Sequence, residues 1–147
     1  MKKQKLYALL LILGASILIF RTVRLLTIEN GWNILANWVI ILTFIEMTID
    51  ALCIIFSFQW LIRNSKTHKS ISLRFGAAAT VFHAFRVLIY VLGRTGPWIN
   101  FDIKPQYRHE HTVDFFWVYF AAILSVLGIL GVMIIWIRIK RAKRNPC

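Results

Sequence analysis

Four long apolar stretches dominate the sequence and limit what the chain can fold into. They run over residues 6–28, 37–62, 71–93 and 113–137. Each provides the roughly 20 residues that an α-helix needs to cross the ~30 Å hydrocarbon core of a bilayer. Of the 147 residues, 59% are hydrophobic and 16% are charged, whereas soluble domains average about 45–50% and about 25%. The sequence therefore predicts a small integral membrane protein and excludes a disordered chain.

The positive charge is concentrated in three segments, and their positions predict the topology. The N-terminal tip, the region of residues 63–74 and the tail after residue 137 together hold twelve Lys or Arg and no acidic residue. With four spans, all three segments lie on one side of the membrane, and the positive-inside rule makes that side cytoplasmic. We therefore expect one all-α domain over residues 1–147, an up-down-up-down four-helix bundle with both termini cytoplasmic, in a cytoplasmic or inner membrane.

Topology also accounts for the formal net charge of +12. A basic protein of this size could bind nucleic acid, but a charge excess confined to one side of the membrane needs no such partner, and we expect none. The partner that the sequence predicts directly is the lipid bilayer.

The first stretch has a second interpretation, because a basic start followed by an apolar run is also typical of a signal peptide. No convincing small-x-small cleavage site comes before Arg21, and apolar character resumes at Leu25. We expect this span to be retained.

The strongest sign of chemistry lies inside the second and third stretches. Glu46 and Asp50 are four residues apart, which places both on one helical face. The third stretch carries His83 and Arg86, with Tyr90 one turn further along. At 1.5 Å rise per residue, the acids and the cations lie at similar depths, roughly 14–21 Å from the inner interface. We therefore predict an intramembrane polar cluster formed by these five residues.

Charge pairing is close to obligatory at that depth, where a lone charge costs at least ~3 kcal/mol. Arg86 cannot lose its proton, so it needs a carboxylate. The second carboxylate then has only His83, or a proton, to balance it. We expect one titratable proton to be shared among Glu46, Asp50 and His83. The alternative is a purely structural cluster, or one that pairs with a partner subunit.

The polar segment over residues 94–112 is the longest connector and is rich in aromatic residues. Its rings are typical of an interfacial belt. His109 and His111 are weak candidates for zinc ligands, because two histidines with no regular partner spacing are a poor motif. We expect a solvated loop and no metal. We also expect no cofactor.

The sequence contains none of the common catalytic motifs that we sought: no P-loop, Gly-x-Ser-x-Gly, His-Glu-x-x-His or Cys-x-x-Cys. The leading hypothesis is a non-enzymatic subunit or accessory of a larger membrane complex, in contact with other membrane subunits or with copies of itself. The alternative is a proton- or ion-linked transporter or channel that uses the polar cluster. A membrane-embedded enzyme acting on a lipid or isoprenoid is the third hypothesis. A cluster sealed from water favours the first of these, and a water-filled path the second.

Overall fold

The computed structural model describes residues 2–95 and 100–108, together with single positions further along the chain. Those positions are Ile123, Leu127, Gly131, Ile134, Ile135, Ile137, Arg138 and Arg141. The described residues form helices and contain no β-strand, which confirms the all-α prediction.

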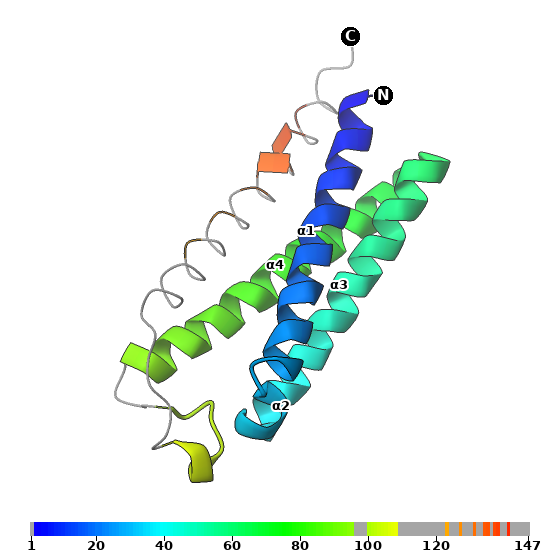
Figure 1. Cartoon of the computed structure of the whole chain (residues 1–147). Coiled ribbons are helices and arrows are strands. Elements are labelled where there is room, and N and C mark those ends of the chain that lie inside the picture. Colours follow the sequence, from blue (N-terminus) through cyan, green and yellow to red (C-terminus); the bar gives the residue numbers. More distant parts are fainter. Residues whose placement is uncertain are drawn as a thin grey trace.

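Three helices are long and apolar enough to cross a membrane (Figure 1). They are α1 (Lys2–Thr27), α3 (Asn37–Arg63) and α4 (Lys66–Thr95). The candidate spans within them are Lys5–Thr27, Asn37–Arg63 and Lys66–Arg94. These segments match the first three predicted stretches. The fourth stretch lies outside the described residues apart from its single positions, so the four-helix topology stays a prediction.

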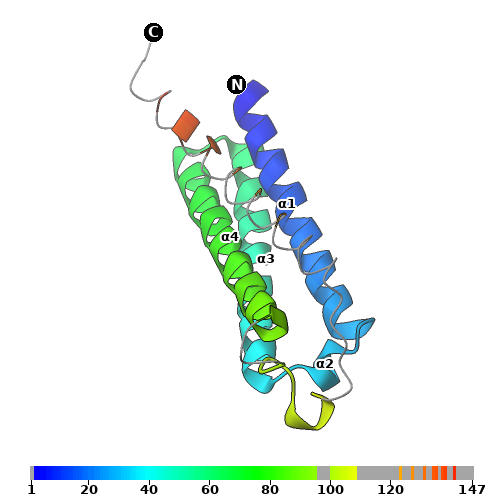
Figure 2. The same ribbon diagram turned by 90° about the vertical axis from the view of Figure 1, so that its left-hand side faces the viewer.

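Helix α3 is the central element, since it packs along both α1 and α4, whereas α1 and α4 contact each other much less. Successive helices run in opposite directions (Figures 1 and 2). Figure 1 shows α4 inclined to the other two helices, so that it diverges from α1 toward its C-terminal end. Ile135 packs against a buried apolar cluster that includes Ala8 and Trp60.

The buried face of α3 is largely polar, and its exposed face is apolar. The buried positions are spaced alternately by four and three residues, as expected for one face of a helix. They are Val39, Thr43, Glu46, Asp50, Cys53, Ser57 and Trp60. Large apolar side chains such as Ile41, Phe44 and Phe58 are exposed. This arrangement reverses that of a soluble bundle and suits a helix whose outer face contacts lipid.

At one end of the molecule, which we call the basic end, α3 and α4 are joined by a tight turn. Asn64 has a left-handed backbone with φ of 48° and ends α3, where its N–H donates to Trp60 O at 2.9 Å. The Ser65 hydroxyl oxygen accepts a hydrogen bond from the N–H of Thr67 at 3.3 Å. Because of this cap, α4 begins at Lys66, several residues before its apolar stretch.

At the opposite end, which we call the loop end, residues 100–108 fold back onto the connection between α1 and α3. That connection holds the short helix α2 (Gly31–Ile34), and residues 100–108 hold the 3-10 helix η1 (Pro105–Tyr107). Ile103 forms an isolated antiparallel bridge with Leu35. The N–H of Ala36 donates to Asp102 O, and the N–H of Lys104 donates to Ile34 O, both at 2.9 Å. These bonds tie the end of α4 to the start of α3 (Figure 2).

Candidate functional site

Two helices bring four of the predicted residues together in the interior of the bundle. Glu46 and Asp50 come from α3, and His83 and Arg86 come from α4. Arg86 Nε lies 2.7 Å from Glu46 Oε2, and His83 Nε2 lies 2.9 Å from Asp50 Oδ2. His83 Nδ1 lies 3.6 Å from Glu46 Oε2. We call these four residues the charged cluster.

Both carboxylates of the charged cluster are fully buried, with side-chain exposures of 0%. His83 is 6% exposed and Arg86 is 13% exposed. Within the described chain, Glu46 Oε1 and Asp50 Oδ1 have no hydrogen-bond partner. The Nε–H of Arg86 is not directed along a hydrogen bond to Glu46, so their 2.7 Å contact is an ion pair without a linear hydrogen bond. Among the described residues, three buried carboxylate oxygens thus accept no hydrogen bond, Glu46 Oε1 and Oε2 and Asp50 Oδ1, and of these only Glu46 Oε2 faces a cation. Unsatisfied acceptors are costly in the interior of a bundle.

Helix α1 contributes a residue that was not among those predicted. Arg86 Nη2 donates to Thr22 Oγ1 at 3.3 Å, and Thr22 is fully buried. Arg86 therefore connects α4 to α1. A signal for this contact is present in the sequence, because Ala8, Ala15 and Thr22 are small residues at seven-residue spacing and all three are buried.

Tyr90, which was predicted to join the cluster, contacts a different cation. Its ring lies beneath the Arg94 guanidinium, with the guanidinium carbon 4.6 Å from the ring centroid. No hydrogen bond joins Tyr90 to the charged cluster in the described part of the chain.

A second buried ion pair closes the loop end. Arg94 Nη1 and Nη2 donate to Asp102 Oδ1 and Oδ2 at 2.8 and 3.2 Å, and Arg94 Nη1 also donates to Asn100 Oδ1 at 3.1 Å. Asp102 is 3% exposed and Asn100 has a φ of 55°. The prediction that the acids of this loop are solvated is therefore wrong for Asp102. The pairing of Ile103 with Leu35 holds the adjacent carboxylate against Arg94.

Close packing of the backbone makes this second pair possible. A Cβ atom at Gly93 would lie 2.6 Å from Asp102 Oδ1. The N–H of Asn100 also donates to Gly93 O at 2.8 Å. A residue without a side chain is therefore needed where α4 meets the loop.

The buried polar face of α3 continues from the charged cluster toward the basic end. The hydroxyls of Ser57 and Ser72 are hydrogen-bonded to each other, which joins α3 to α4. Cys53 is a free, buried cysteine whose sulfur lies 3.9 Å from Ser72 O. Lys69 Nζ lies 5.8 Å from the ring centroid of the buried Trp60. These groups are small or satisfied, and they pack the helices together.

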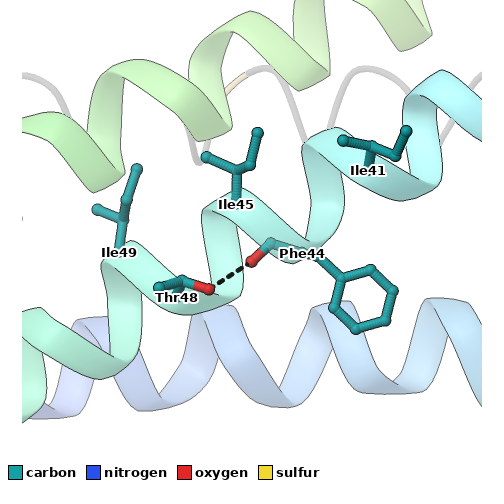
Figure 3. Close-up of a pocket in the computed structure, with 5 residues that line it drawn as sticks. All are labelled: Ile41, Phe44, Ile45, Thr48 and Ile49. Atoms are coloured by element: carbon teal, nitrogen blue, oxygen red, sulfur yellow. Dashed lines mark hydrogen bonds between the residues drawn. The ribbon is translucent and has the colours of Figure 1, made fainter.

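A surface hollow of about 350 Å³ lies on another face of α3 (Figure 3). It is lined by Ile41, Phe44, Ile45, Thr48 and Ile49. The Thr48 hydroxyl donates to Phe44 O at 2.9 Å, so the lining offers no free hydroxyl hydrogen. This hollow contains no residue of the charged cluster and suits the apolar surroundings of a lipid chain.

The metal candidates His109 and His111 lie outside the described residues. In the part of the chain that is described, no group of three or more His, Cys, Asp or Glu is arranged to hold a metal ion. No protein-family model, curated protein or solved structure matches this chain.

Proposed function

We propose that the chain is a multi-span membrane protein that acts as a non-enzymatic subunit or accessory of a larger membrane complex. The burial of the charged cluster, and the pairing of its acids within this chain, support this proposal. Both acids are fully buried, and their nearest cations come from the same chain. An acid–base catalyst has to reach its substrate directly or through one water, and a substrate site is normally a concave pocket. Groups buried in this way instead hold helices together.

The surface hollow gives further support, because it lies on α3 away from the acids and is lined mainly by apolar side chains. A lipid or a neighbouring apolar helix fits such a surface, whereas a polar substrate does not. We propose that assembly with other membrane subunits, or with copies of this chain, takes place through these apolar helix faces.

The experiment that tests this proposal is native mass spectrometry of the protein purified in mild detergent from the cells that produce it. We expect a particle heavier than one chain, with a second polypeptide or a second copy in fixed proportion. A monomer that persists at low detergent concentration would refute the proposal.

The proposal includes four spans with both termini in the cytoplasm of the cell, and it is supported by the three purely basic segments. Reporter fusions at Cys147 and within residues 94–112 should give opposite signals. Matching signals at the two positions would contradict the four-span topology.

A proton- or ion-linked transporter is the second candidate. The observation that favours it is that three buried carboxylate oxygens have no hydrogen-bond partner within the described residues: Glu46 Oε1, Glu46 Oε2 and Asp50 Oδ1. Intramembrane acids commonly mark ion and proton pathways. Purified protein in liposomes should then carry protons or ions across the membrane, and no flux is expected if the chain is only a subunit.

A further inference from the structure

The hydrogen bonds of His83 determine which of its nitrogens carries a proton. Arg86 Nη2 lies 3.2 Å from His83 Nδ1. A guanidinium only donates, so His83 Nδ1 must accept and therefore holds no proton. The proton of the neutral ring is then on Nε2, from which it is donated to Asp50 Oδ2 at 2.9 Å. In this geometry His83 is neutral.

A neutral His83 leaves the charges of the cluster unbalanced. Arg86 carries one positive charge, whereas ionised Glu46 and Asp50 carry two negative charges. From α1, Thr22 is neutral. The neighbouring Arg21 is close enough for its charge to act on Glu46 and Arg86, but it is exposed and forms no ion pair with either acid among the described residues, so Arg86 is the one cation buried with the two carboxylates there. One excess negative charge would thus be buried deep in the membrane, where an unbalanced charge is expensive.

One added proton neutralises this excess negative charge, and the cluster contains carboxylate oxygens that are free to bind it. Glu46 Oε1 and Asp50 Oδ1 are both buried and accept no hydrogen bond within the described residues. Either oxygen could therefore hold a hydrogen without losing an existing bond. The two acids are one helical turn apart on the same face of α3, so we assign the added proton to the pair and not to either residue alone.

We infer that the charged cluster is a proton-binding site, in which one exchangeable proton is shared by Glu46 and Asp50. Binding forms one O–H bond on a carboxylate oxygen with a proton taken from water, and release returns that proton to water. Arg86 keeps one negative charge in place, and His83 donates to Asp50 in both states. The inference does not depend on whether the chain belongs to a complex.

Infrared spectroscopy of the full chain in lipid bilayers tests this inference, because a protonated carboxylic acid has its own carbonyl-stretching band. We expect such a band in the wild type, and we expect it to disappear at alkaline pH. Labelling glutamate alone with ¹³C should shift part of the band, and labelling aspartate alone should shift another part. A wild-type spectrum without the band wherever the protein is folded would overturn the inference, as would a histidinium signal in its place.

Near-isosteric variants show which residues give rise to the carbonyl-stretching band. In Glu46→Gln or Asp50→Asn, the remaining carboxylate balances Arg86, so the band should be lost in each variant. In Arg86→Gln, two acids remain without a cation, and the band should become stronger. Asp102→Asn is the matched control, since that acid is paired with Arg94, and the band should be unchanged. A band that persists in both folded amide variants would refute the site.

Discussion

Replacing Arg86 with alanine is the most direct test of how much the charged cluster contributes to folding. The substitution removes the ion pair with Glu46 at 2.7 Å. It also removes the hydrogen bonds to Thr22 at 3.3 Å and to His83 at 3.2 Å. Two carboxylates would then be buried with no cation beside them.

The expected magnitude follows from these losses. Breaking a buried ion pair by removing one partner costs ~3–5 kcal/mol in soluble proteins. Each hydrogen bond between membrane helices contributes ~0.6 kcal/mol on average. Proton uptake by the freed acids offsets part of the cost, so we expect a loss near the lower limit, about 3 kcal/mol. That corresponds to roughly a hundredfold change in the unfolding equilibrium constant.

Unfolding by a denaturing detergent, followed by circular dichroism in mixed micelles, measures this free energy. The matched control is Arg108→Ala, because Arg108 is exposed and its Nε donates only to Ile103 O at 3.1 Å. We expect the control to lose about 1 kcal/mol or less. Equal losses in Arg86→Ala and Arg108→Ala would refute the argument that Arg86 neutralises a buried acid.

Compensating substitutions identify the partner of Arg86. Glu46 is its direct ion-pair partner, whereas Asp50 is hydrogen-bonded to His83. In Arg86→Leu with Glu46→Leu, the ion pair is removed as a unit and Asp50 keeps its hydrogen bond with His83. In Arg86→Leu with Asp50→Leu, Glu46 is left without its cation and His83 without its carboxylate partner. We expect the first double variant to be more stable than the second, in the same unfolding assay. The reverse order would contradict the observed pairing.

Three further predictions concern other parts of the molecule. Thr22→Val should reduce the unfolding free energy by roughly 0.6–1.7 kcal/mol, and Thr22→Ser should be near neutral; a loss of the same size in both would show that the hydroxyl is not responsible. Gly93→Ala should cost about 1–3 kcal/mol by overpacking, because its methyl group would lie 2.6 Å from a carboxylate oxygen. Gly14→Ala is the control and should not destabilise the protein, because a methyl group there meets no atom of the described residues within 4 Å apart from its own helix backbone and chain neighbours. The double change of His109 and His111 to Ala should leave thermal stability unchanged. A large loss of stability in this variant, together with a stabilisation by added zinc that is seen in the wild type and not in the variant, would indicate a metal site instead.

The central part of the fold could be predicted from the sequence because it depends on helical spacing. The four-residue separation of Glu46 and Asp50 places both on one face, and the antiparallel order of the second and third spans brings that face to the depth of His83 and Arg86. These are local geometric facts about helices of known rise. The lengths and positions of the first three spans follow from apolar runs in the same way.

The loop end could not be predicted because its contacts are not periodic. Asp102 is buried through a bridge between Leu35 and Ile103, which are far apart in the sequence. The burial of Asp102 also depends on the left-handed backbone of Asn100. A polar stretch is ordinarily read as solvated, and no local pattern in the sequence distinguishes an acid that finds a buried cation. Tyr90 differs from Asp102, because its contact does follow helical spacing: Arg94 lies one turn beyond it on α4, with its guanidinium over the ring. Helical spacing alone does not decide between Arg94 on one side of Tyr90 and Arg86 on the other.

The one-turn spacing of the two acids has a consequence for how α3 and α4 find their alignment in the bilayer. In the observed alignment Arg86 meets Glu46 and His83 meets Asp50. Sliding α4 by one turn toward the basic end would bring Arg86 to Asp50 and leave Glu46 unpaired among apolar side chains. Sliding it the other way would bring His83 to Glu46 and leave Asp50 unpaired. Apolar helices tolerate many sliding positions, so the acids and their partners select the one register in which no buried carboxylate is left alone.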